Sequence, residues 1–448
     1  MAERSSSTNT YLLVPILLVA VLLSTAVIRG PHLVSMSGFG SAIIVAAPLT
    51  LATYSLMALA VAGRATVDLA VGPLLAFINV SVVKLNMLDI VTGPFSVFLV
   101  ALGIGVLYQL LFALIIIWVR VQPIIVALSG FLALSGINLV ILPRPGGVAP
   151  EWMGNWGLGT TIFSPVLLIV LIATAGWLLF TLTPFYANLR MIGYDERAAW
   201  TSGVRTNIVR IGAHVIAGLF VGLGAICYTA LIASGDPTQG TTMTLAAVTA
   251  LVLGGVSLTG GRGGVTGALL GAINLFLIGY VLSTFNFGAI QAFVTQMSYG
   301  IILVLSLLLT LLVPIVGRHI SFISPWAAFI VLAIVVSGIM LQVATSATYL
   351  PAEGVVGAAQ GDLMTRYLLI APAEGGFGGL SLSPIQKLAF GVVAALVVLT
   401  FSAKLIMAEA PAARMGLFLY VFVVAMLILL FAVVADQSGA ADFLGVGS

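Results

Sequence analysis

Charged side chains are scarce in this chain and gather at one place. Lysine, arginine, aspartate and glutamate make up 6% of the 448 residues. Six of them fall between Arg190 and Arg210, in the stretch RMIGYDERAAWTSGVRTNIVR, and a long apolar run lies on each side of it. A polar helix exposed between two apolar runs has the groups needed to dock another protein, and a solvated loop is the alternative. We expect a docking surface here.

The other polar residues form no recognisable catalytic or metal site. The sequence has no Ser/His/Asp arrangement, paired carboxylates or Cys/His cluster. Its three histidines lack metal-ligand spacing, and the single cysteine, Cys227, lies among apolar residues. None of the three lysines follows a glycine, which excludes the nucleotide-binding loop G-x-x-x-x-G-K-[ST]. We expect no cofactor in this chain; if ATP drives it, another chain binds ATP and Mg²⁺.

The composition indicates that the chain folds in a membrane. Hydrophobic residues make up 61% of it and its mean hydropathy is +1.25. Apolar runs of roughly 18 to 25 residues recur along its length, and a bilayer core of ~30 Å requires helices of that length. A β-barrel would instead alternate apolar and polar residues. The sequence therefore predicts an all-α polytopic membrane protein, and nothing in it indicates nucleic-acid binding.

We divide the chain into two parts. Residues 1–320 are expected to hold about ten transmembrane helices, near 11–28, 40–62, 69–87, 95–118, 122–142, 163–183, 206–233, 243–257, 264–284 and 294–316. Residues 321–448 form a C-terminal extension with about three spans, near 326–344, 386–407 and 415–435, and an extracytoplasmic loop over 346–384. The run at 11–28 lacks a small-residue cleavage site, so we interpret it as a retained first span rather than a signal peptide.

The distribution of basic residues sets the orientation. With the N-terminus in the cytoplasm, eleven of the sixteen lysines and arginines lie inside, namely Arg4, Arg64, Arg120, Arg190, Arg197, Arg205, Arg210, Arg262, Arg318, Lys404 and Arg414. The positive-inside rule favours this orientation over its inverse. The charged segment at 190–210 is therefore expected to face the cytoplasm.

An internal repeat is visible. Residues 72–79 and 267–274 share the pattern G-x-L-L-x-x-I-N, and each copy follows a Gly-Arg pair, Gly63-Arg64 or Gly261-Arg262. Transporters are often built from two similar halves with broken helices in matching positions. Asp68, a lone acid near the first break, is either a functional group or the N-cap of the third span.

Four motifs in the correct order resemble the ABC permeases that import ribose and other monosaccharides. Residues 66–72 (TVDLAVG) resemble that family's G-G-I-D-L-S-V-G signature, with the acid kept at Asp68 and the serine replaced by Ala70. Residues 121–128 (VQPIIVAL) are similar to V-x-x-F-I-A-T-L. Residues 193–204 resemble the cytoplasmic G-x-N-x-x-A-A-x-x-S-G-I loop, and 253–261 resemble L-G-G-T-S-L-x-G-G. The resemblance covers about residues 40–316.

The resemblance implies partners and a role for the charged segment. Members of this superfamily of monosaccharide and branched-chain amino acid importers work as dimers, with a second permease copy or a paralogue. Cytoplasmic ATP-binding-cassette ATPase subunits and a periplasmic or extracellular solute-binding protein complete the assembly, in a bacterial cytoplasmic (inner) membrane. The coupling helix that docks the ATPase corresponds to about residues 187–204, and the implied coupling residues are Asp195, Glu196, Arg197, Ala198, Ala199, Gly203 and Arg205. We expect the two alanines and Gly203 to allow close approach.

We expect a sugar or related polyol as the substrate. Deep charged residues are nearly absent, and neutral hydrogen-bonding side chains can guide a hydroxyl-rich molecule without trapping it. The candidate path residues are Asp68, Asn79, Asn138, Thr249, Asn274 and Gln296, and each amide or hydroxyl could equally bond a neighbouring helix. A branched-chain amino acid or nucleoside permease, and an ATP-independent secondary transporter, are the alternatives.

Overall fold

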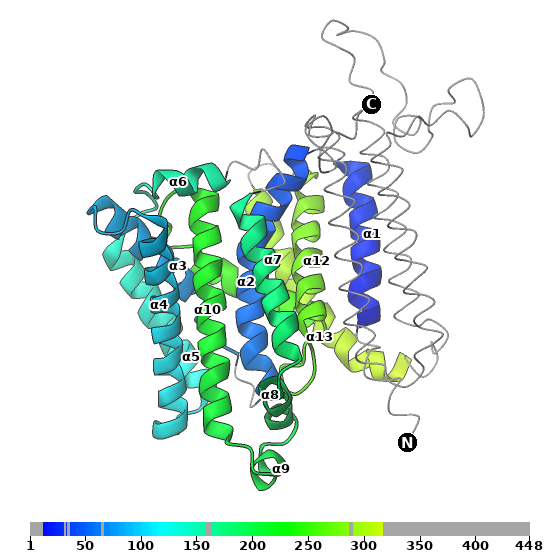
Figure 1. Cartoon of the computed structure of the whole chain (residues 1–448). Helices are drawn as coiled ribbons and strands as arrows, with labels where there is room; N and C mark the ends of the chain where they lie inside the picture. The colour runs from blue at the N-terminus through cyan, green and yellow to red at the C-terminus, as the bar shows by residue number, and fades with distance from the viewer. Residues whose placement is uncertain are drawn as a thin grey trace, which may run out of the picture. The chain divides into compact units, whose positions relative to one another are not determined.

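The computed structural model describes residues 12–30, 33, 36–63, 67–157, 164–285 and 290–316 (Figure 1). Within these residues the chain is helical, and the β-type pairing that they contain is an isolated bridge between Gly146 and Gly235. The long helices are α1 (Leu13–Arg29), α2 (Met36–Val61), α3 (Val71–Met87), α4 (Pro94–Leu114), α5 (Pro123–Ile141), α7 (Pro165–Thr181), α10 (Thr206–Ile232), α11 (Gly240–Leu253), α12 (Val265–Ser283) and α13 (Gln291–Val316). The expected C-terminal extension, 321–448, lies outside the described residues.

Shorter elements join these helices. A π-helical turn, η4 (Ile115–Val119), continues α4, and α6 (Glu151–Gly154) with the 3-10 turn η5 (Asn155–Gly157) precedes α7. Two short helices, α8 (Pro184–Tyr194) and α9 (Glu196–Thr201), lie between α7 and α10. The charged segment of the sequence is therefore helical, as expected.

The apolar runs and the helices coincide. Each run expected between residues 11 and 316 matches one helix, with ends that agree within four residues. Five described helices are long and apolar enough to cross a membrane, or six if the bent pair α7–α8 is one span. The other four, α1, α3, α11 and α13, contain shorter apolar helices. The chain is a multi-pass membrane protein, and ten crossings remain a prediction.

Helix α10 lies at the centre of the described bundle, between α4 and α2 (Figure 1). Gly218 and Gly222, four residues apart on α10, face α4. A Cβ atom on Gly218 would lie 2.6 Å from the carbonyl oxygen of Gly105, so only glycine permits this helix spacing. Small residues at four-residue spacing are the usual means by which membrane helices approach closely.

An aromatic cluster fixes the direction of α7 and α8. Buried Trp177 of α7 stacks on Phe220 of α10, with ring centroids 5.5 Å apart, and meets Tyr186 of α8 edge-on at 6.2 Å. The Tyr54 hydroxyl of α2 hydrogen-bonds the Thr174 hydroxyl of α7 at 3.0 Å. These contacts hold α8 in place where it bends 76° away from α7.

Replacing Trp177 with alanine should destabilise the bundle by about 3 kcal/mol, because a large buried side chain leaves a cavity. Trp118, 77% exposed on η4, provides the matched Trp→Ala control. Thermal unfolding in detergent checks the difference. Equal losses for the two variants would contradict the anchoring role of Trp177.

Candidate functional site

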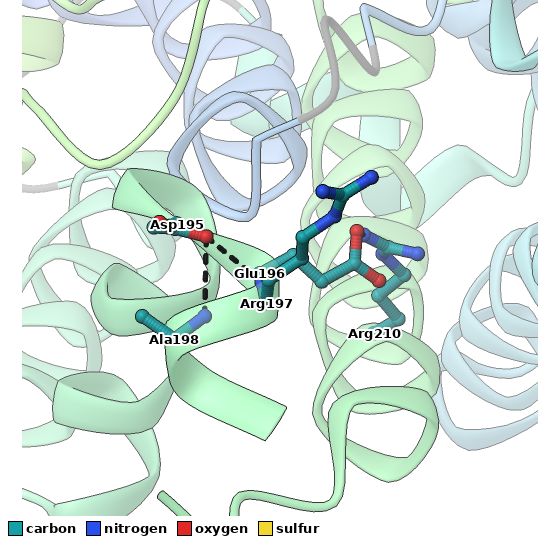
Figure 2. Close-up of polar contacts among 5 residues, drawn as sticks. All are labelled: Asp195, Glu196, Arg197, Ala198 and Arg210. Atoms are coloured by element: carbon teal, nitrogen blue, oxygen red, sulfur yellow. Dashed lines mark hydrogen bonds and ion pairs between the residues drawn. The ribbon is translucent and has the colours of Figure 1, made fainter. Parts of the chain in front are cut away.

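The charged segment folds as two helices rather than the single helix expected over about 187–204. Pro184 occupies the first turn of α8, where a missing N–H costs nothing, and the Thr183 hydroxyl accepts from the Tyr186 N–H at 3.3 Å. Asp195 then leaves the helical conformation, with φ −155° and ψ 107°. Its Oδ1 accepts from the N–H groups of Arg197 (2.9 Å) and Ala198 (3.1 Å), which begins α9 (Figure 2).

Helix α9 exposes a surface of mixed character. Arg197, Ala198 and Trp200 of α9 are exposed, as is Arg205 just before α10, and we call these four residues the α9 surface. Trp200 is 70% exposed. Tryptophan and arginine are the residues most enriched at the energetic centres of protein interfaces. Trp200 was not among the residues predicted from the sequence, although its position inside the charged segment was a usable signal.

Two residues expected to allow close approach of a partner do something else. Ala199 is fully buried and belongs to the core of this chain. Gly203 is exposed but has a φ of +85°, a left-handed conformation that favours glycine. Its N–H bonds the Trp200 carbonyl at 3.0 Å, and the Val204 N–H bonds the Ala199 carbonyl at 3.1 Å. These two residues set the packing and the end of α9.

Glu196 faces its own chain. Its carboxylate oxygen Oε2 lies 2.8 Å from a guanidinium nitrogen of Arg210 on α10 (Figure 2). The two side chains are 24% and 8% exposed, so the pair is largely shielded from water. A shielded, charge-assisted contact is stronger than an exposed surface pair. Glu196 thus holds α9 against the first turns of α10, whereas the sequence predicted that it faces a partner.

The end of α8 contacts two glycine-rich connections, which we call the first and second breaks: residues 62–70, between α2 and α3, and residues 254–264, between α11 and α12. A Cβ atom on Gly63 would lie 2.8 Å from the Cα atom of Gly193. One on Gly193 would lie 2.5 Å from the Gly261 nitrogen, and one on Gly260 would lie 2.5 Å from the Gly63 Cα. We call Gly63, Gly193, Gly260 and Gly261 the glycine junction. Real Cβ atoms do not approach backbone so closely, so side chains at these positions would separate the three segments.

Polar contacts close the glycine junction. The Gly261 N–H donates to the Val61 carbonyl at 3.2 Å, which joins the two breaks directly. The Arg190 Nε donates to the Gly261 carbonyl at 3.3 Å and so joins α8 to the second break. The Tyr194 ring packs against Gly261. A displacement of α8 therefore acts on both breaks together.

Asp68 is buried between α2 and α3. Its Oδ1 accepts from the Ala70 N–H at 2.9 Å, and its Oδ2 accepts from the Gln109 Nε2 at 2.6 Å. The N-cap position of α3 is Ala70 and no side chain caps that helix, so the interpretation of Asp68 as the N-cap is wrong. Within the described residues no group of three or more His, Cys, Asp or Glu could hold a metal ion.

The remaining candidate path residues occupy contacts inside the bundle. Asn79 donates to the Thr229 hydroxyl and the Ser234 carbonyl and accepts from the Asp236 N–H. Three others are buried and each donates to one backbone carbonyl: Asn138 to that of Pro73, Thr249 to that of Leu245 and Asn274 to that of Pro15. Gln296 is exposed. Their role in a substrate path stays a prediction.

The geometry defines a multi-pass helical protein in which the short α8–α9 element packs against the two breaks. Residues 34–308 match the family described as "Branched-chain amino acid transport system / permease component". The chain belongs to this family of ABC permeases, as the sequence motifs indicated.

Three relatives illustrate the similarity. The ribose import permease protein RbsC of Bacillus subtilis (strain 168) is 30% identical over 250 residues, which cover 54% of this chain and 76% of that protein. RbsC of Escherichia coli (strain K12) is 28% identical over 249 residues, with the same two shares. The galactose/methyl galactoside import permease protein MglC of Escherichia coli (strain K12) is 31% identical over 206 residues, 44% of this chain and 61% of MglC. No solved structure matches this chain.

Removing the Asp195 cap should loosen α9. Asp195→Ala deprives two N–H groups of their acceptor, and loss of an N-cap costs about 1 kcal/mol, so hydrogen exchange at Arg197 and Ala198 should quicken roughly fivefold. Asp195→Asn keeps an accepting oxygen and should preserve the protection. Equal exchange rates in the alanine variant and the unaltered chain would show that Asp195 does not hold α9.

Proposed function

We propose that this chain is the membrane-spanning permease subunit of an ATP-driven importer, and that the α9 surface docks an ATP-binding-cassette ATPase. The glycine junction carries the proposal. The α8–α9 element exposes arginines and a tryptophan at α9, and it packs on both breaks at the end of α8. Such an element is suited to pass a partner's movement into the bundle as a rigid-body shift. ATP and Mg²⁺ belong to the ATPase subunits, and the permease itself needs no cofactor.

The proposed substrate is a sugar or related polyol. Relatives of this chain are named for ribose and galactose import, and one is the autoinducer 2 import system permease protein LsrD. The candidate path residues Asp68, Asn79, Asn138, Thr249, Asn274 and Gln296 offer mainly neutral hydrogen-bonding groups, which suit hydroxyl-rich molecules. We propose that they reach the path in another conformation of the permease, because all but Gln296 are buried in this one.

The assembly has further proposed members. A periplasmic or extracellular solute-binding protein delivers the substrate, and a second copy or a paralogue completes a dimeric permease in a bacterial inner membrane. Asn79 and Asn274, at equivalent positions of the G-x-L-L-x-x-I-N pattern, are both buried and donate to α10 and to α1 respectively. This correspondence supports two pseudo-repeated halves within residues 1–320.

Arg197→Glu with Trp200→Ala should abolish recovery of an ATPase subunit when the tagged protein is isolated from native membranes. The pair of changes removes one cation and the largest apolar contact from the α9 surface, and single interface hot spots contribute about 2 kcal/mol or more. Arg144→Glu reverses an exposed arginine expected on the opposite side of the membrane and serves as the control. Unchanged recovery with the altered α9 surface would place the docking site elsewhere.

Deleting the gene for this chain in its host should abolish high-affinity uptake of one labelled sugar, because the permease supplies the route across the membrane. Leucine uptake should stay intact. A panel containing ribose, galactose and leucine tests this, with re-expression of the chain as the control. Loss of leucine uptake alone would favour the branched-chain amino acid alternative. Concentrative uptake without any ATPase subunit would favour a secondary transporter.

A further inference from the structure

A buried chain of polar side chains crosses the bundle close to α9. The Gln109 Nε2 of α4 donates to the Asp68 carboxylate at 2.6 Å, and the Gln109 Oε1 lies 2.8 Å from the His214 Nδ1 of α10. All three side chains are at most 3% exposed. Groups 41 and 105 residues apart in sequence are thus held in one line of hydrogen bonds, which we call the polar chain.

The polar chain has a fixed direction. An amide donates through nitrogen and accepts through oxygen, so with Nε2 committed to Asp68 the Gln109 oxygen requires His214 to donate from Nδ1. Each member donates to the next, from His214 to Gln109 to Asp68. A primary amide is a poor proton relay, so the arrangement is suited to holding position rather than to moving protons.

The polar chain ends one turn of α10 away from the contact with α9. Arg210 lies one turn before His214 on α10, and both line a small cavity with Leu59, Ala62, Ile116 and Pro123. Arg210 is the residue that pairs with Glu196 of α9 at 2.8 Å. One turn of α10 therefore separates the α9 contact from the polar chain, and an α-helical turn is a rigid connection.

We propose that Gln109 and His214 are positioning residues that connect α9 to the start of α3. This inference rests on the proposed function. The α2–α3 break is held on its α2 side by the glycine junction, through Gly63, and on its α3 side by the polar chain, through Asp68. When α9 moves with the ATPase, α10 carries His214 with it, and the hydrogen bonds through Gln109 carry Asp68 and the first turn of α3.

The polar chain gives the Asp68 carboxylate a role in the spacing of α3. A buried carboxylate without partners is strongly unfavourable, and the Ala70 and Gln109 donors offset that cost only while α3 and α4 keep their present spacing. Apolar residues of the same shape would hold the helices equally well in one state. With an acid at Asp68, the distance between α3 and α4 depends on the Asp68–Gln109 hydrogen bond, and through Gln109 it depends on His214.

The test uses the full-length permease with its ATPase subunits in lipid nanodiscs. Spin labels at Thr201→Cys on α9 and Lys84→Cys near the end of α3 report whether α3 follows α9 when ATP and vanadate trap the complex, without any transported substrate. Both positions are exposed, and native Cys227 is fully buried. In the unaltered chain the distance should stay unchanged on trapping, because the polar chain makes α3 move with α9.

Gln109→Met keeps the length of the side chain and removes both amide groups. It should preserve ATPase recovery and hydrolysis within about twofold. The ratio of complexes with a changed Thr201–Lys84 distance to those with an unchanged one should rise about tenfold on trapping, because α9 moves and α3 no longer follows. His214→Leu should act in the same way. His214→Asn should restore the unchanged distance, because its side-chain nitrogen can take the place of Nδ1. Thr53→Val, a buried change whose lost hydroxyl bonds only the Leu49 carbonyl, controls for loss of a buried polar group.

Each outcome decides one question. A distance that stays unchanged on trapping in both Gln109→Met and His214→Leu overturns the polar-chain proposal, and so does a distance that changes in His214→Asn. If the leucine variant does not accumulate, the comparison of Gln109→Met with Thr53→Val decides. Absence of any ATPase from the unaltered preparation contradicts the proposed function instead.

Discussion

The structure depends on backbone contact between three segments that lie far apart in sequence. Gly63, Gly193, Gly260 and Gly261 bring the end of α8 and both breaks within van der Waals distance, with no side chain between them. Packed protein interiors respond to a push by shifting whole elements, because they contain little free volume. A docking element built on this junction cannot move without either moving both breaks or breaking the contact.

Helix α10 supports the same arrangement over its length. Its first turns carry Arg210, which holds α9 through Glu196, and His214, which joins the polar chain. Further along, Gly218 lets α4 pack closely, and Phe220 stacks on Trp177 of α7. Helices α8, α9 and α4 are therefore all held against α10, which fixes their positions relative to one another.

The sequence predicted the helices well because membrane spans are set by long apolar runs, and backbone groups in lipid must be paired within a helix. It also located the charged segment, since 6% charge makes any cluster visible. The interruption between α8 and α9 at Asp195 was harder to predict. An aspartate before a helix is a common cap, but the residues that precede Asp195 are helical as well. Membership of the ABC permease family was indicated by four motifs.

Side-chain pairings were beyond the sequence for a physical reason. Gln109 and His214 acquire their roles only from partners on other helices, and nothing local distinguishes them from isolated polar residues in apolar runs. Glu196 was expected to face a partner because it lies in the charged segment, whereas the helical register turns it toward Arg210. The candidate path amides gave the same difficulty, since Asn79 and Asn274 bond neighbouring helices in this conformation.

The most direct test of this account is the distance between spin labels at Thr201 on α9 and Thr259 in the second break, both exposed. It is measured in the complex with ATPase subunits, with and without ATP and vanadate. If the glycine junction makes these segments one body, the distance distribution stays narrow and unchanged on trapping. A distribution that shifts or broadens on trapping would show that α9 moves independently of the break, and would contradict the account.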